Sequence, residues 1–511
     1  AFMVGETVVV ESKPASPDLA ANKWTSDGTG TYNIAAADAS DLQRGCRITI
    51  NLKDTALEFA DSARIKDIIT KYSNFVNFPI KIDGEVINTV KAIWTESPSE
   101  VSEEEYQAFY RFQAGGWDEP AFRLHYRADA PIDLKVLFYV PSFHTEKWGE
   151  GRMEPGVSLY SRKVLIEKEC PDILPDWMRF IKGVVDSEDL PLSISREKPQ
   201  DSRLLKKIEQ VLVRRVLRFL NEKAQKEPEA YKKWFAEFGF FLKEGVCRDF
   251  NNQAEIAKLL YFESSTMDGG ELTSLDDYVA RCTPEQNEIY YLSAPSRTLA
   301  EASPYYETFK RNNREVIFVY NAIDDFVMNN LQTYNKRKIV SAESKDIKLD
   351  EETDDDKDAE GKEGVVKLSE EEAAKLGAWM TTRLPDKLSE VRTTTRLQGS
   401  PAIITEHESG QLRRMMRMVE QQSTGTAVAG IPPQQMEINP GHPIMVGLYK
   451  LQEAGADDAT AKMILEQVVD NALVTAGIMD DARSMVSRVN GLVELLLKER
   501  VDEAEGAAAE K

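Results

Sequence analysis

The spacing of apolar positions in the first part of the chain predicts β-strands. Residues 7–10 form a β-branched run, and residues 47–52 alternate between apolar and polar with a period of two. Turn residues are concentrated within residues 22–33, and residues 61–72 are expected to form a helix. These elements amount to less than a domain, so we expect them to pack on a segment upstream.

A longer period predicts a helix that begins near Ser202, with Asp201 at its N-cap. Its apolar residues recur at spacings of three and four and form one stripe: Leu205, Ile208, Leu212, Val216 and Phe219. Before this helix, an apolar segment at residues 173–181 is expected to end at Gly183. A loop that carries Arg196 joins the two.

Strands alternate with helices farther along the chain. We expect strands at residues 134–140, 157–166, 288–292, 315–320 and 390–397, and a helix at residues 303–311. The stretch from 288 to 320 has the length of a βαβ unit. The pattern therefore predicts a multidomain protein of the α/β (α+β) class, with a helical hairpin between two α/β parts.

Three helices are expected to close the chain. Pro440 suits the first position of one helix, and Gly477 suits the C-terminal cap of the next. The last two helices carry these apolar stripes: Ile464, Leu465, Val468, Ala472 and Ala476, then Met485, Val489, Leu492 and Leu496. Two antiparallel amphipathic helices make half of a four-helix bundle, so a symmetric partner would cover them. Burial against their own domain is an equal alternative.

Composition indicates about three domains and no disulfide framework. The 511 residues exceed what one core supports, and eight acids among the eleven residues 350–360 predict a solvated linker. The net charge of −22 would repel nucleic acid and anionic membranes, so neither is expected as a principal partner. The cysteines lie far apart and indicate free thiols in a reducing compartment: Cys46, Cys170, Cys247 and Cys282.

The sequence contains no P-loop, dinucleotide fingerprint, GxSxG or HExxH motif, and its four histidines form no metal cluster. No apolar run reaches membrane-spanning length, and no signal peptide is visible after Ala1. Arg196, followed by Gln200, is the candidate for phosphate chemistry, because a guanidinium matches phosphate oxygens. A loop arginine is more often a surface residue or an ion-pair partner, here of Asp186 or Glu188, and both interpretations stay open.

Several segments resemble one known family. Lys182-Gly-Val-Val-Asp-Ser-Glu-Asp-Leu-Pro-Leu, with Ser195-Arg196-Glu197, resembles the middle domain of the 90-kDa heat-shock chaperones (heat-shock protein 90). Further similar segments, in family order, are Tyr72-Ser-Asn-Phe-Val-Asn-Phe-Pro-Ile, Ala92-Ile-Trp94, Leu159-Tyr-Ser-Arg-Lys-Val, Tyr261-Phe-Glu-Ser-Ser and Ser303-Pro-Tyr-Tyr-Glu. Ala294-Pro-Ser-Arg-Thr-Leu-Ala-Glu is most similar to the mitochondrial branch, the tumour-necrosis-factor-receptor-associated protein.

The resemblance implies an N-terminally truncated member of that family, with most of the nucleotide pocket upstream of Ala1. Its parts would be the following: 1–80, the end of a GHKL-type ATPase domain; 81–340, an α/β middle domain with a helical hairpin; 341–367, an acidic linker; 368–500, an α/β C-terminal domain ending in dimerisation helices; and 501–511, a polar tail. The tail lacks the Glu-Glu-Val-Asp ending that recruits cochaperones in cytosolic members.

The resemblance also implies roles for single residues. Arg196 would contact the γ-phosphate of ATP, and Gln200 would assist, although Lys198-Pro199 replace the family's usual apolar pair. Cys46 stands where the family usually has a threonine beside the adenine, with a small buried residue as the alternative interpretation.

Client contacts are implied at two places. Trp94 lies in a segment where an exposed tryptophan contacts clients, although a lone tryptophan is more often part of a core. Met415, Met416 and Met418 form either an adaptable client surface or ordinary core.

The function that follows is an ATP-dependent molecular chaperone, a homodimer that binds unfolded clients and couples ATP hydrolysis with Mg²⁺ to dimer closure. This chain alone is expected to lack ATPase activity. The resemblance points to the mitochondrial matrix, with the cytoplasm as the alternative. The competing hypothesis is a non-catalytic dimeric scaffold that binds unfolded segments without ATP coupling.

Overall fold

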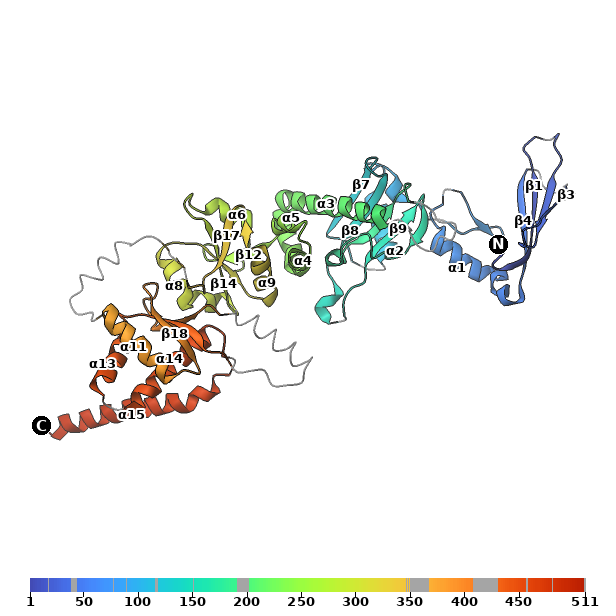
Figure 1. The fold of residues 1–511 in the computed structure, drawn as a ribbon. Coiled ribbons are helices and arrows are strands. Elements are labelled where there is room, and N and C mark those ends of the chain that lie inside the picture. Colours follow the sequence, from blue (N-terminus) through green and yellow to red (C-terminus); the bar gives the residue numbers. More distant parts are fainter. Residues whose placement is uncertain are drawn as a thin grey trace. The chain divides into compact units, whose positions relative to one another are not determined.

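The computed structural model describes the 511 residues except 17, 38–43, 77, 89, 115–117, 150, 191–201, 346, 348, 350–366, 408–430, 456–457, 480 and 510–511. The chain divides into two compact units, residues 1–216 and 217–511. Each unit is a mixture of sheets and helices, as the predicted α/β class requires (Figure 1). The predicted boundaries at residues 80, 340 and 367 stay predictions.

The first unit contains two main sheets, and helix α3 begins within it. Its elements are β1 (Gly5–Lys13), β2 (Asn22–Ser26), β3 (Asn33–Ala36), β4 (Gly45–Leu52), η1 (Asp54–Ala60), α1 (Ser62–Tyr72), β5 (Lys81–Ile82), β6 (Glu85–Val86), η2 (Ile93–Thr95), α2 (Glu103–Ala114), β7 (Phe122–Ala128), β8 (Leu134–Val140), η3 (Thr145–Trp148), β9 (Gly156–Ser161), β10 (Val164–Glu167), η4 (Asp176–Met178), β11 (Lys182–Asp186) and α3 (Ser202–Lys226).

The first sheet has the strand order β3-β2-β1-β4, and all its neighbours are antiparallel. β1 and β4 pair with Val8 opposite Ile50 and Val10 opposite Ile48. The following helix α1 begins where Asp61 accepts a hydrogen bond from the Ala63 amide, which satisfies one of the free N–H groups of its first turn. The strands and the helix predicted here are confirmed.

The second sheet has the order β10-β9-β11-β8-β7 and places β11 at its centre. β11 runs parallel to β9 and antiparallel to β8. The predicted single strand at 157–166 is in fact the hairpin β9–β10, which turns at Arg162 and Lys163 with φ of 50° and 67°. These residues are not typical of a two-residue turn, so the sequence pattern did not reveal it.

Gly183 was predicted to end the apolar segment. It lies inside β11 instead. Its φ is +143°, and a Cβ added there would lie 2.1 Å from the Leu137 carbonyl oxygen. Gly183 is therefore required for the close approach of β11 to β8, which only a residue without a Cβ permits.

The second unit contains a six-stranded sheet, a three-stranded sheet and the closing helices. Its elements are α4 (Pro228–Arg248), α5 (Gln253–Ala257), β12 (Tyr261–Ser264), β13 (Thr273–Ser274), α6 (Leu275–Arg281), β14 (Glu288–Ser293), α7 (Arg297–Glu301), α8 (Pro304–Arg311), β15 (Val316–Val319), α9 (Ala322–Leu331), β16 (Thr333–Tyr334), β17 (Arg337–Ser341), α11 (Glu370–Arg383), β18 (Leu388–Thr393), β19 (Ala402–Thr405), β20 (Gln434–Ile438), α13 (Pro443–Ala454), α14 (Asp458–Thr475) and α15 (Arg483–Ala509).

The six-stranded sheet has the order β13-β12-β15-β14-β17-β16. β14 pairs in parallel with β15 on one side and with β17 on the other. The chain leaves β14 through α7 and α8 to reach β15, and then returns through α9 to the opposite side of β14. The predicted βαβ unit is confirmed, and the strand order reverses at β14.

The last part of the chain packs into one core with the six-stranded sheet. The β18-β20-β19 sheet, α13 and α14 share a cluster of buried side chains with α8 and β14. The predicted α14 stripe is buried here apart from Ile464, which is partly buried, and Gly477 ends the helix with a φ of +69°. The helix predicted to begin at Pro440 begins at Pro443 instead, because His442 accepts the Ile444 amide and takes the N-cap position.

We predict that Gly183→Ala destabilises the protein by roughly 2–4 kcal/mol, because the new methyl group collides with backbone rather than with a movable side chain. Gly84→Ala is the matched control, since Gly84 also has a positive φ, +92°, but a Cβ added there would have no atom within 4 Å. The control should lose about 1 kcal/mol. Urea denaturation followed by tryptophan fluorescence measures both, and equal losses would contradict the steric explanation.

Candidate functional site

The residues predicted to act on phosphate, Arg196 and Gln200, lie outside the described residues. The same is true of Met415, Met416 and Met418. Their predicted roles therefore stay predictions. The structure does describe the strand that leads into the Arg196 segment and the residues that hold its end.

β11 ends at a buried carboxylate, Asp186, which is 1 % exposed. Its Oδ2 atom accepts hydrogen bonds from Nε1 of Trp94 at 3.0 Å and from the Lys163 amide at 2.9 Å. The next residue, Ser187, donates its amide to the Tyr160 carbonyl at 3.1 Å. The chain therefore leaves the sheet toward Arg196 from a position that three hydrogen bonds fix.

Two more acids hold the chain just beyond β11. Glu188 accepts a hydrogen bond from Nζ of Lys135 at 2.7 Å, and this bond lowers the pKa of the Glu188 carboxyl. Asp189 accepts from the Asp133 amide at 2.8 Å. These partners come from β8 and the segment before it. Asp186 and Glu188 thus have partners among the described residues, and whether Arg196 also pairs with them stays open.

The predicted exposure of Trp94 is wrong. Trp94 is 1 % exposed and packs in an aromatic cluster, with ring centroids 4.7 Å from Phe75, 5.1 Å from Tyr160 and 5.6 Å from Phe109. The alternative interpretation, a core residue, is the one that the structure shows. A buried indole N–H needs an acceptor, and Asp186 supplies it.

Cys46 lies on β4 with its side chain exposed, so its interpretation as a small buried residue is wrong. Its Sγ atom is 3.2 Å from Oγ of Ser12 on the neighbouring strand. The nucleotide contact proposed for Cys46 stays a prediction.

The helix α15 has one face on α14 and one face exposed. Met485 is buried, and Arg488 forms ion pairs with Glu466 and Asp470 of α14. The exposed apolar stripe of α15 consists of Val486, Val489, Val493, Leu496, Leu497 and Val501, which are 40 to 63 % exposed. So many large apolar side chains along one helix are typical of a surface that another chain covers.

Comparison with known proteins shows the family. The family model described as Hsp90 protein matches residues 81–511. The chain belongs to the heat-shock protein 90 family. This confirms the resemblance found in the sequence.

The relatives of this heat-shock protein 90 family member include mitochondrial and bacterial proteins. Over 499 residues it is 45 % identical to "TNF receptor-associated protein 1 homolog, mitochondrial" of Dictyostelium discoideum, covering 97 % of this chain and 68 % of that protein. It is 44 % identical to "Chaperone protein HtpG" of Desulfitobacterium hafniense, covering 98 % and 79 %. It is 41 % identical to "Heat shock protein 75 kDa, mitochondrial" of Rattus norvegicus, covering 96 % and 69 %. These names support a molecular chaperone.

Two kinds of feature are absent from the described part of the chain. None of the helices described is both long and apolar enough to cross a membrane. Within the same ranges, no group of three or more His, Cys, Asp or Glu residues is arranged to hold a metal ion.

We predict that Trp94→Phe lowers the free energy of unfolding by about 1–3 kcal/mol, because it removes a hydrogen bond from a buried carboxylate while keeping an aromatic ring in the cluster. Trp148→Phe is the control, since Trp148 is 66 % exposed, and should change stability by less than about 0.5 kcal/mol. Chemical denaturation measures both. Unchanged stability together with weaker binding of an unfolded protein would instead restore Trp94 as a client contact.

Proposed function

We propose that this chain is part of an ATP-dependent molecular chaperone that binds unfolded or partly folded proteins as a homodimer. The observation that carries the proposal is the family match over residues 81–511, together with relatives named as chaperones at 41 to 45 % identity. ATP and Mg²⁺ would be held mostly by residues upstream of this chain, with Cys46 at the edge of the pocket. The chain alone would then have no ATPase activity.

Arg196 would contact the γ-phosphate and stabilise the charge that develops on it during hydrolysis. The geometry in support is the fixed end of β11: Asp186 and Ser187 are held by hydrogen bonds only ten and nine residues before Arg196. A cation on a segment that starts from a fixed point can be aimed at a phosphate in another domain. Closure of that domain on the ATP would bring Arg196 to it.

We predict that Arg196→Ala, in a chain extended to the full length of its relatives, leaves ATP affinity within a few-fold and lowers turnover by about a hundredfold. Removing a hydrogen-bond donor that points at the developing charge raises the free energy of the transition state by on the order of 3 kcal/mol, which lowers turnover. ATP affinity should change little, because the adenine and ribose are bound by other residues. Nucleotide titration and steady-state ATPase assays separate the two effects.

Arg196→Lys is the matched variant for this test. It keeps the positive charge but loses the two-pronged guanidinium, so it should restore turnover only in part. Normal turnover in Arg196→Ala would refute the assignment.

Dimerisation through α15 is the second part of the proposal. The exposed apolar stripe of α15 would pack against the same stripe of a second copy, as in a four-helix bundle. α14 would contribute less than predicted, because most of its own stripe is already buried within the unit.

We predict that the double variant Val493→Glu/Leu497→Glu weakens dimerisation at least a hundredfold, since each buried side chain lost removes about 1.5–3 kcal/mol of apolar burial. The control is Ser487→Glu/Lys498→Glu, which also adds acidic charge to exposed positions of α15, but off the stripe. Light scattering over a concentration series measures the dissociation constants. If both variants remain equally dimeric, the interface lies elsewhere.

The remaining assignments concern clients and compartment. With Trp94 buried, Met415, Met416 and Met418 are the residues still proposed to contact clients. The mitochondrial matrix is proposed from the names of two relatives, with the cytoplasm as the alternative.

The competing hypothesis is a non-catalytic scaffold. It would also be a dimer, but ATP would have no effect on its client binding, so measuring client affinity at increasing nucleotide concentration separates the two hypotheses.

A further inference from the structure

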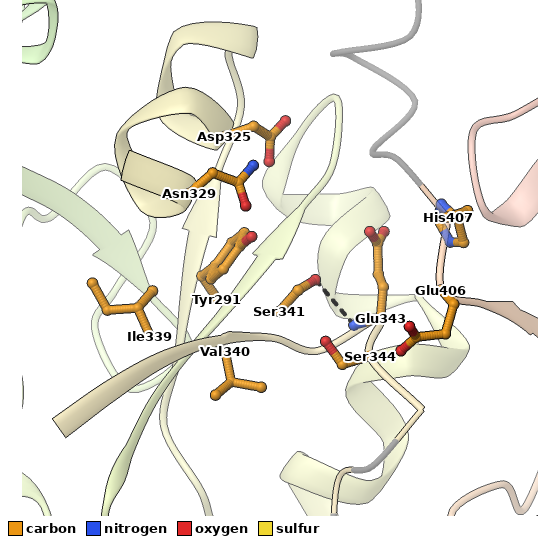
Figure 2. Close-up of a pocket in the computed structure, with 10 residues that line it drawn as sticks. All are labelled: Tyr291, Asp325, Asn329, Ile339, Val340, Ser341, Glu343, Ser344, Glu406 and His407. Atoms are coloured by element: carbon orange, nitrogen blue, oxygen red, sulfur yellow. Dashed lines mark hydrogen bonds between the residues drawn. The ribbon is translucent and has the colours of Figure 1, made fainter. Parts of the chain in front are cut away.

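A cavity of about 600 Å³ lies at the carboxyl ends of β14 and β17 in the second unit (Figure 2). Tyr291 of β14 lies opposite Ser341 of the parallel strand β17. The connections that follow β14 and β15 lead to opposite sides of β14, so the cavity lies at a reversal of strand order. Open α/β sheets bind ligands at this place, because the diverging connections leave a crevice there.

The walls of this cavity combine acidic, aromatic and aliphatic groups. The lining residues are Tyr291, Asp325, Asn329, Ile339, Val340, Ser341, Glu343, Ser344, Glu406 and His407. Figure 2 shows Asp325 and Asn329 coming from α9, and Glu406 and His407 from the segment after β19. Three carboxylates therefore meet around a space that Tyr291 and two aliphatic residues also line.

Among the lining residues, Glu343 gives the strongest indication that the cavity binds a ligand. It is 7 % exposed and contributes to the cavity wall, and Figure 2 shows its carboxylate pointing toward the side that Asp325 and His407 line. Its backbone amide donates a hydrogen bond to Oγ of Ser341 at 3.2 Å. Among the described residues, its carboxylate has no hydrogen-bond or ion-pair partner. A buried acid without a partner is costly, and a ligand with donors would relieve that cost.

Two basic side chains near Glu343, Arg396 and Lys345, form ion pairs with other acids. Nε of Arg396 lies 2.9 Å from Glu437, and Nη1 of Arg396 donates to the Ser344 carbonyl. Nζ of Lys345 lies 3.8 Å from Glu406. Neither Arg396 nor Lys345 therefore pairs with Glu343.

The other titratable groups around Glu343 are Asp325 on α9, Tyr291 on β14, Tyr305 on α8, and Glu406 and His407 on the segment after β19, which line the same cavity. Asp325 accepts a hydrogen bond from Oγ of Ser293 at 3.2 Å. Burial, and then the charge of Asp325, raise the pKa of Glu343 to about 8. Glu343 is therefore mostly protonated at neutral pH in the empty site, and a bound cation would favour its ionised form.

We propose that this cavity binds an organic cation, a guanidinium or ammonium group on a short alkyl chain, with Glu343 and Asp325 as its charge partners. The cavity is much larger than a metal ion requires, and the described acids show no metal-binding arrangement. Tyr291, Ile339 and Val340 would contact the alkyl part, since an aromatic face attracts cations and aliphatic walls cover methylene groups. The cation is either a free small molecule or the basic side chain of a polypeptide.

The test is calorimetric titration of the chain with agmatine, an alkyl guanidinium, at pH 6.5, 7.5 and 8.5. Affinity should rise with pH, because below about pH 8 Glu343 must lose a proton before it pairs with the cation. Binding at pH 7.5 should release protons, seen as a heat that varies with the ionisation enthalpy of the buffer. Affinity that falls with rising pH, or binding without proton release, would overturn the proposal.

Glu343→Gln keeps the shape of the side chain and removes its charge. It should weaken agmatine binding at pH 8.5 at least tenfold and abolish the proton release. Glu271→Gln, at an exposed position outside the cavity, is the control and should bind like the parent chain. If Glu343→Gln, shown to be folded by circular dichroism, binds agmatine as well as the control does, the proposal is wrong.

Two further titrations identify the source of the cation. One titration uses an extended peptide with a central arginine, and the other uses the same peptide with alanine in its place. If only the arginine peptide competes with agmatine, the natural ligand is a polypeptide side chain. Agmatine binding without peptide competition would identify a small molecule. If neither ligand binds, or if MgCl₂ binds at this site and agmatine does not, the proposed ligand class is wrong. None of these measurements depends on ATP hydrolysis, so they stand apart from the proposed chaperone cycle.

Discussion

The hydrogen bond between the Trp94 indole and the buried Asp186 carboxylate joins two parts of the first unit that are far apart in sequence. A carboxylate taken out of water needs donors, and here they come from Trp94 and the Lys163 amide. The same contact places an aromatic cluster against the end of the central strand β11. Removing Asp186 would leave the buried indole N–H without its acceptor, and removing Trp94 would leave the carboxylate with the Lys163 amide as its remaining donor. The start of the segment toward Arg196 therefore depends on this pair.

Close approach of backbones is the second constraint on β11. Gly183 allows β8 to approach where any side chain would meet the Leu137 carbonyl oxygen. Together with the hydrogen bonds at Asp186, this fixes the strand in register with both neighbours. The predicted role of Arg196 requires this rigidity, since a cation can stabilise developing charge only if its position is set before the reaction.

The second unit uses its apolar surface in two different ways. α14 buries its stripe against the β18-β20-β19 sheet, whereas α15 exposes most of its apolar side chains. In the same unit, the crossing connections around β14 bring Glu343 near Asp325 in a cavity where no described cation pairs with Glu343. An exposed apolar stripe and an unpaired buried acid are both costly in isolation, and in each case a binding partner would remove the cost.

Local pattern was enough to predict much of this protein. The βαβ unit from β14 to β15, the helices α1 and α14, and the family itself followed from residue spacing and from segments such as residues 182–192. These features depend on neighbours in sequence, which is why periodicity reveals them.

Other features depend on contacts between distant residues. The burial of Trp94, the exposure of Cys46 and the place of Gly183 inside β11 were predicted wrongly or left open, because each is set by a neighbouring strand or cluster. Glu343 carried no signal in the sequence, because a single glutamate after a strand is ordinary. Only the tertiary structure, by folding α9 and the segment after β19 around the end of β17, encloses that carboxylate beside a second one and makes it a candidate binding residue.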